Sequence, residues 1–277
     1  MADTTLPHSG GETEIVISAD STPIAFERTG NGPPLVLVHG VTHVHEFWDL
    51  TGVRSAFAEH FTVYALDRRG RGESGDATEY DLAREAEDVV AVVDSISEPV
   101  VLLGHSGGAL YSLEAALRTD NLRKLVVNEP PIQISEQELE VKEVVDEMNR
   151  LLDDGKNEQA LMLFLQAEAH LTPNEIDVAR SAPIWQDMVD AAHTLPREWQ
   201  AIAEYEFNPA RFADVTTPTL VLGGGESPPF YKHATEAVTE ALPNSQLIRF
   251  DGQSHEPMNT APDRFIEEVL TFIRDSD

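Results

Sequence analysis

A serine flanked by glycines carries the clearest chemical potential in this sequence. Ser106 stands at the centre of Gly-His-Ser-Gly-Gly, residues 104–108, between an apolar run at 100–103 and a helical pattern at 109–117. At a sharp strand-to-helix turn a serine hydroxyl is exposed, and bulky side chains two residues to either side would collide with neighbouring backbone. The spacing therefore predicts that Ser106 is a nucleophile.

A serine hydroxyl needs a base within hydrogen-bonding distance to attack at neutral pH. The expected base is His255, which follows an apolar run at 247–250 after a four-residue loop. This position places it at the sheet edge that carries Ser106. Two other histidines are expected to act locally: His39 to shape a neighbouring loop and His105 to pack inside the turn.

The elements that must position these groups alternate between short apolar runs and longer amphipathic stretches. Strands are predicted at 14–17, 24–27, 35–38, 63–66, 100–103, 125–127, 219–222 and 247–250, and helices at 78–97, 109–118 and 262–274. Buried strands separated by helices are typical of a doubly wound, mostly parallel α/β sheet.

The interval 132–214 departs from this alternation. It shows no convincing strand, and apolar residues such as Val145, Met148 and Leu152 recur at helical spacing. We predict an inserted cap of about four helices, over a core formed by residues 1–131 and 215–277. A cap inserted after the carboxyl end of a strand covers the edge where such sheets bind ligands, so part of it should line a pocket.

The composition constrains the partners. There are 49 acidic and 19 basic residues, with a formal net charge of −30. Such a chain repels nucleic acid and anionic membranes. The acid-rich, lysine-poor composition resembles that of proteins from salt-loving microbes, because molar salt shortens the Debye length to about 3 Å and screens the repulsion. We expect partial unfolding when salt is removed.

The length and the residue classes also limit the possibilities. With 277 residues and 41% hydrophobic residues, the chain can form one large core with an insertion. It lacks a basic-then-apolar leader and a long apolar run, which favours a cytoplasmic protein without a membrane span. The absence of cysteine excludes disulfides and a thiol nucleophile. Whether the chain forms a homo-oligomer stays open.

Four features together resemble the α/β-hydrolase family: His39-Gly40 after a strand, the segment Asp67–Ser74 (Asp-Arg-Arg-Gly-Arg-Gly-Glu-Ser), the turn at Ser106 and the late His255. The resemblance covers nearly the whole chain except the cap. It implies a serine nucleophile, a histidine base, a carboxylate that orients the histidine, and an oxyanion hole of two backbone N–H groups. By position these are the N–H groups of Val41 and Gly107.

Two residues are candidates for the carboxylate. The commonest family pattern takes an aspartate after the penultimate strand, but the loop after 219–222 offers only Glu226. A second arrangement takes the acid from the strand that follows the nucleophile helix, where Glu129 precedes two prolines. That arrangement resembles lactone-cleaving members of the fold. We favour Glu129 and keep Glu226 as the alternative.

Some neighbouring residues have competing interpretations. Asp67 ends a strand, but in the family motif this aspartate mostly shapes a loop. Phe47 and Trp48 follow the oxyanion loop and could form a wall of the acyl pocket or pack in the core. His43 and His45 form a His-x-His pair, and we assign no metal to it because the sequence shows no third clustered ligand.

These residues predict a serine hydrolase that cleaves a small carboxylic ester or lactone through an acyl-enzyme on Ser106. The serine excludes relatives that use an aspartate nucleophile, such as haloalkane dehalogenases and epoxide hydrolases. No dinucleotide fingerprint, phosphate loop or metal cluster calls for a cofactor. The alternatives are carbon–carbon bond hydrolysis, cofactor-free haloperoxidase chemistry, and a ligand-sensing signalling protein of the same fold.

Overall fold

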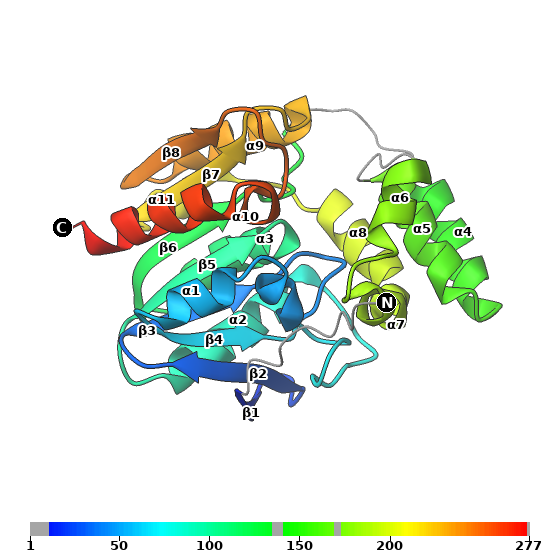
Figure 1. Ribbon diagram of the computed structural model, residues 1–277, viewed down its shortest axis with the longest axis horizontal. Helices are drawn as coiled ribbons and strands as arrows, with labels where there is room; N and C mark the ends of the chain where they lie inside the picture. The colour runs from blue at the N-terminus through cyan, green and yellow to red at the C-terminus, as the bar shows by residue number, and fades with distance from the viewer. Residues whose placement is uncertain (1–10, 135–140, 169–172, 276–277) are drawn as a thin grey trace.

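In the part of the chain that the structure describes, eight strands form one sheet in the order β1-β2-β4-β3-β5-β6-β7-β8 (Figure 1). The computed structural model describes residues 11–134, 141–168 and 173–275. The strands are β1 (Glu12–Ile17), β2 (Pro23–Gly30), β3 (Pro34–Val38), β4 (Thr62–Leu66), β5 (Val100–His105), β6 (Leu122–Asn128), β7 (Thr219–Gly224) and β8 (Ser245–Phe250). Strand β2 runs antiparallel to β1 and β4, and the other pairs are parallel. The predicted mostly parallel sheet is confirmed.

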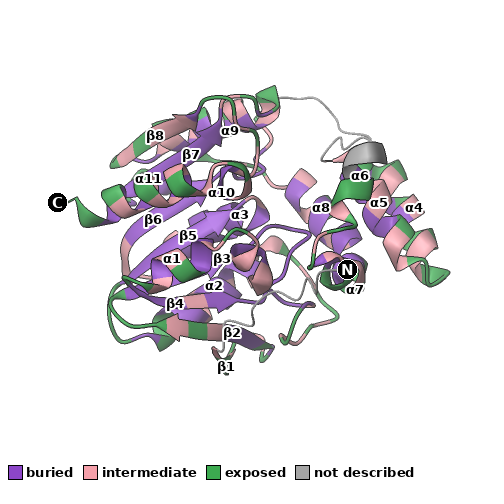
Figure 2. Cartoon of the chain, viewed as in Figure 1, coloured by how far each residue is buried: buried purple, intermediate pink, exposed green. Residues whose placement is uncertain are grey.

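The centre of the sheet is its most buried part. Every residue of β3, β5 and β7 is buried, whereas β1 at one edge is mainly exposed (Figure 2). Continuous runs of Val and Leu suit strands covered on both faces, and an edge strand is protected by charged side chains such as Glu12 and Glu14. The central strands therefore give the site a rigid base.

Helices cover both faces of the sheet. In Figure 1, α1 (Val53–Ala58) and α11 (Pro262–Arg274) lie side by side on the face toward the viewer. On the other face α2 (Leu82–Ser95) packs against α3 (Gly107–Ala116), and α9 (Pro229–Ala241) packs on β7 and β8. The predicted helix 262–274 is confirmed. The predicted helix 78–97 is shorter, because Asp81 caps its start by accepting a hydrogen bond from the Arg84 N–H at 3.0 Å.

A helical region lies between β6 and β7, on the side of the molecule opposite the C-terminus (Figure 1). Its α-helices are α4 (Val141–Asp153), α5 (Asn157–Ala167), α6 (Pro173–Ala179), α7 (Trp185–Asp190) and α8 (Leu195–Ala203), with 3₁₀ turns η2 (Ala191–Thr194) and η3 (Pro209–Phe212). The predicted absence of strands holds for the described part of this interval. The described part holds five α-helices, where about four were predicted, and two of them, α6 and α7, are short separate segments.

Polar side chains tie this cap to the core at its base. The Tyr205 hydroxyl, just after α8, donates a 2.7 Å hydrogen bond to Oε1 of Glu114 on α3. Arg211 on η3 pairs with the same carboxylate at 2.7 Å. The cap is therefore anchored to the helix that carries Ser106 at its start.

No helix within the described ranges is long and apolar enough to cross a membrane.

Candidate active site

Ser106 occupies the apex between β5 and α3. Its backbone has φ 53° and ψ −123°, a region that costs a non-glycine residue free energy. A Cβ on Gly104 would lie 2.4 Å from the Gly108 carbonyl oxygen, and one on Gly108 would lie 2.4 Å from the Val38 oxygen. Both glycines are therefore required for close backbone contact, and the predicted strand–turn–helix geometry is confirmed.

Glu129 follows β6 directly and is fully buried. Its Oε2 lies 2.7 Å from Nδ1 of His255, and its Oε1 accepts a 2.6 Å hydrogen bond from the Gly224 N–H. Like Ser106, Glu129 has a positive φ, of 47°, which is uncommon for a residue with a side chain. The backbone thus turns sharply where the carboxylate faces the histidine, and both oxygens have partners.

Glu226, the alternative acid, lies apart from this pair. Its side chain is exposed on the loop after β7. Its backbone N–H donates a 2.8 Å hydrogen bond to the Gln253 oxygen, which fixes the loop. Of the two candidates, Glu129 is the one in contact with His255.

His255 is held in one tautomer by this contact. Because Nδ1–H points at Glu129, Nε2 is left free to accept a proton. Burial alone would lower the pKa of His255, but the hydrogen bond and charge of Glu129 raise it above its usual value, with further contributions from Glu168 and Glu256. The histidine is therefore an effective base with a stabilised charged form.

A cavity of about 870 Å³ opens above Ser106 and His255. From the cap, Phe164, Trp199 and Ile202 line it, and Glu168 adds a carboxylate. Among the described residues that line it there is neither lysine nor arginine. The cavity is large enough for a small organic molecule and favours apolar groups over anions.

The loop after β3 is held from behind by two buried arginines. Arg71 donates to the backbone oxygen of Val41, and Arg68 donates to that of Gly40 at 3.0 Å. Carbonyl groups held on one side leave the amide side of this loop for the cavity, which Val41 lines. The expectation that the Asp67–Ser74 segment shapes loops is confirmed: the Asp67 carboxylate accepts hydrogen bonds from the N–H groups of His45 and Glu73.

The same arginines bind the cap. Arg68 pairs with Glu85 of α2 through two hydrogen bonds of 3.0 and 2.7 Å. Glu198 of α8 pairs with both Arg68 and Arg71, and all four side chains are almost fully buried. A buried ion pair is costly to break from one side, because the remaining charge is left without a partner. This network therefore fixes the cap relative to the loop after β3.

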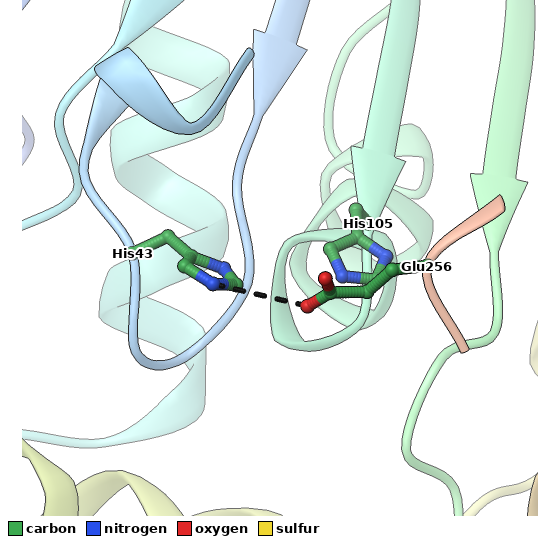
Figure 3. Close-up of side chains that lie close together, drawn as sticks. All are labelled: His43, His105 and Glu256. Carbon is green, nitrogen blue, oxygen red and sulfur yellow. Dashed lines mark ion pairs between the residues drawn. The ribbon is translucent and has the colours of Figure 1, made fainter. Parts of the chain in front are cut away.

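The His-x-His pair is divided between two clusters, so the expectation that no third ligand lies nearby was wrong for each histidine. His43 lies near His105 and Glu256, with Nε2 3.8 Å from Glu256 Oε1 (Figure 3). His45 bonds to Asp67 at 3.0 Å, near Glu46. Each group offers metal-type ligand atoms.

Both clusters already have structural roles. His105 Nδ1 accepts a 3.0 Å hydrogen bond from the Asn128 side chain, and its ring stacks on Phe47 at 5.3 Å between centroids. The ring of His43 also stacks on that of Phe47, with 4.0 Å between centroids. Phe47 and Trp48 are buried to 1% exposure, which confirms core packing and not the pocket wall. We assign no metal to these groups.

Three residues of the site were missed in the sequence. Asn128 donates to His105 and, at 3.1 Å, to the His255 backbone oxygen, so it joins the nucleophile strand to the histidine loop. Tyr231 and Glu168 lie in the cavity and bond to each other. The signal for Asn128 was its place as a polar residue at the end of an apolar strand, just before Glu129. No sequence spacing relates Tyr231 or Glu168 to the site.

The model of the alpha/beta hydrolase family matches residues 35–268. The chain belongs to the alpha/beta hydrolase family. This hydrolase is 34% identical to an alpha/beta hydrolase from Sphaerobacter thermophilus, with a TM-score of 0.82 over 94% of this chain and 100% of the other.

Two further relatives of this hydrolase are esterases. An esterase from Rhodococcus sp. is 28% identical, with a TM-score of 0.74 over 94% of this chain and 98% of that one. A pimeloyl-(acyl-carrier protein) methyl ester esterase of Aeromonas hydrophila is 28% identical over 258 residues, which cover 90% of this chain and 99% of the relative. By these similarities this hydrolase is esterase-like.

Proposed function

We propose that this protein is a serine hydrolase that cleaves a small carboxylic ester or lactone. The observation that supports this most is the 2.7 Å contact between Glu129 and His255, beside a strained Ser106 at the base of a largely apolar cavity. A nucleophile, a base and an orienting acid, which follow β5, β8 and β6, are the set that acyl transfer requires.

In this mechanism Ser106 Oγ attacks the substrate carbonyl carbon while His255 Nε2 takes the serine proton. Glu129 holds the imidazole in orientation and stabilises the imidazolium that forms. The N–H groups of Val41 and Gly107 bind the negative oxygen of the tetrahedral intermediate. The imidazolium then protonates the leaving alcohol, and water hydrolyses the acyl-enzyme.

The cavity lining supports a neutral substrate. Aromatic and aliphatic side chains of the cap face the nucleophile, and the carboxylate of Glu168 would repel an anionic group placed beside it. A cavity of about 870 Å³ accommodates a lactone as well as an open-chain ester. Residues 132–214 are the proposed cap that selects among these substrates.

The test is release of p-nitrophenol from short-chain p-nitrophenyl esters in molar KCl, comparing the wild type with Ser106→Ala. We expect turnover in the wild type and its loss in the variant, with unchanged melting temperatures. Turnover that persisted in Ser106→Ala would contradict the proposal. Lactones are then screened with the same pair of proteins.

We further propose that the acidic surface is adapted to high salt, on the strength of the net charge of −30. At molar ionic strength the repulsion between the surface carboxylates is screened, whereas at low salt it destabilises the folded chain. The melting temperature should rise between low and molar KCl. An unchanged value would contradict this adaptation.

A further inference from the structure

Tyr231 lies on the histidine side of the nucleophile. It is the third residue of α9, which follows β7, and only 7% of it is exposed. Its ring centroid is 4.2 Å from that of His255, with the planes 30° apart. In the sheet, β5 and β6 lie between β3, which precedes the oxyanion loop, and β7, which precedes Tyr231. Tyr231 is therefore placed away from the oxyanion and beside the base.

The Tyr231 hydroxyl is held by the cap. It donates a 2.9 Å hydrogen bond to Oε1 of Glu168, the residue that ends α5. Burial raises the pKa of the phenol well above its usual range, and the Glu168 charge raises it further. The phenol thus keeps its single proton at neutral pH and donates it in the hydrogen bond to Glu168.

Ser106 and Tyr231 line the same cavity, and the serine side chain lowers the pKa of the phenol against the effect of burial. Because the phenol proton is directed at Glu168, the phenol oxygen faces the cavity only as an acceptor. Tyr231 is therefore an acceptor that faces the nucleophile, next to the ring of His255.

Acylation removes the serine proton. Once Ser106 Oγ is an ester oxygen it carries no proton, so the buried phenol oxygen is left with an unused acceptor site. Nε2 of His255 is at that stage an acceptor as well, after the imidazolium has protonated the leaving alcohol. The acyl-enzyme thus presents two neighbouring acceptors, which one water molecule can satisfy with its two O–H groups.

We propose that Tyr231, oriented by Glu168, positions the water that hydrolyses the acyl-enzyme. This inference rests on the proposed function. The water donates one O–H to His255 Nε2 and the other to the Tyr231 oxygen. Its oxygen forms a bond to the acyl carbon while the first proton passes to Nε2. The bond from that carbon to Ser106 Oγ then breaks, Oγ takes the proton from Nε2, and the acid leaves with the second proton.

Methanol distinguishes this role from a merely structural one. An alcohol has a single O–H, so it can bond to His255 or to Tyr231 but not to both. The wild type should therefore favour water over methanol as the acceptor of the acyl group. Without the phenol oxygen this advantage of water is lost.

The experiment measures the ratio of methyl butyrate to butyrate formed from p-nitrophenyl butyrate at a fixed methanol concentration. In Tyr231→Phe we expect the ratio to rise about 3- to 10-fold, the effect of one lost neutral hydrogen bond. Deacylation should slow, so that p-nitrophenol is released in an initial burst, while the rate of acylation is retained. A ratio equal to that of the wild type would overturn the inference.

Tyr205→Phe is the matched control. It removes another tyrosine–carboxylate bond between cap and core, to Glu114 at 2.7 Å, and should leave the product ratio unchanged. Glu168→Gln keeps the phenol but not the carboxylate, and should raise the ratio less than Tyr231→Phe does. If Tyr231→Phe fails to fold, an unchanged ratio in Glu168→Gln overturns the inference.

Ser106→Ala separates this inference from the proposed function. Loss of both products in Ser106→Ala, together with an unchanged ratio in Tyr231→Phe, contradicts only the role of Tyr231. Products that persist in Ser106→Ala exclude the acyl-enzyme, and the inference falls with the proposed function.

Discussion

On one side of Ser106 the oxyanion loop is backed by the guanidinium groups of Arg68 and Arg71, whereas on the other side His255 is surrounded by carboxylates. In the proposed mechanism, the transfer of a proton from serine to histidine creates a negative oxygen on the first side and a positive imidazolium on the second. Each of these charges forms beside fixed charges of the opposite sign, which stabilise the separation. The two sides of Ser106 thus carry fixed charges of opposite sign.

The pKa values of His39 and His255 are shifted in opposite directions by the charges on the two sides. Burial and the charges of Arg68 and Arg71 lower the pKa of His39, on the oxyanion side, well below its usual value. For His255 the carboxylates outweigh burial and raise the pKa. Burial, with the charge of Arg68, lowers the pKa of Arg71 to about 9, which leaves it charged at neutral pH. Similar burial thus has opposite outcomes on the two sides.

The largest expected effect removes the carboxylate support of the base. Glu129→Gln should lower kcat by up to about 10⁴-fold, because an amide neither fixes the tautomer nor stabilises the imidazolium. Glu226→Gln is the matched control and should change kcat little, since the side chain is exposed. The measurement is kcat on one p-nitrophenyl ester. A larger loss of kcat in Glu226→Gln than in Glu129→Gln would show that Glu226 is the carboxylate that orients His255.

The next effect tests whether the oxyanion side is a buried ionic clamp. Glu198→Gln leaves Arg71 without its carboxylate, and we expect a loss of about 3–5 kcal/mol in the free energy of unfolding. Glu87→Gln breaks a partly exposed pair with Arg84, at 2.7 Å, and should cost under about 1 kcal/mol. Urea unfolding in molar KCl measures both. Equal losses would show that burial adds nothing to the clamp.

The smallest effect is a change in pH dependence on the histidine side. Only neutral His255 can accept the serine proton, so kcat/KM should fall as the pH drops through its raised pKa, above 6.5. Glu256→Gln removes one carboxylate that favours the imidazolium, while Glu129 and Glu168 remain. The acid limb should move to lower pH with the plateau retained. Glu236→Gln, which loses a surface pair with Arg249, should not move it.

Much of this arrangement could be predicted because it depends on local sequence. Apolar runs mark buried strands, and the strand ends then bring Ser106, Glu129 and His255 to one edge. The turn at Ser106 carries its own geometric requirement for Gly104 and Gly108. These features need no knowledge of how distant segments pack.

The remaining contacts depend on how the cap docks, which has no local signature. Glu168 and Tyr231 are 63 residues apart, and Arg71 and Glu198 are 127 residues apart. Each residue taken alone resembles an ordinary charged or aromatic surface position. The pairing follows only from the orientation of amphipathic helices over the sheet, and periodicity gives their faces but not their docking.

The position of Glu129 has a consequence for how the site can diversify. Ser106 and Glu129 belong to one continuous β5-α3-β6 crossover, and the chain enters the cap only after Glu129. A replacement cap, joined after Pro131 and before β7, would change the walls of the cavity while this crossover remains intact. Of Ser106, Glu129 and His255, only His255 reaches the site from the far side of the insertion. The reactive centre and the selective surface are thus separable modules within one chain.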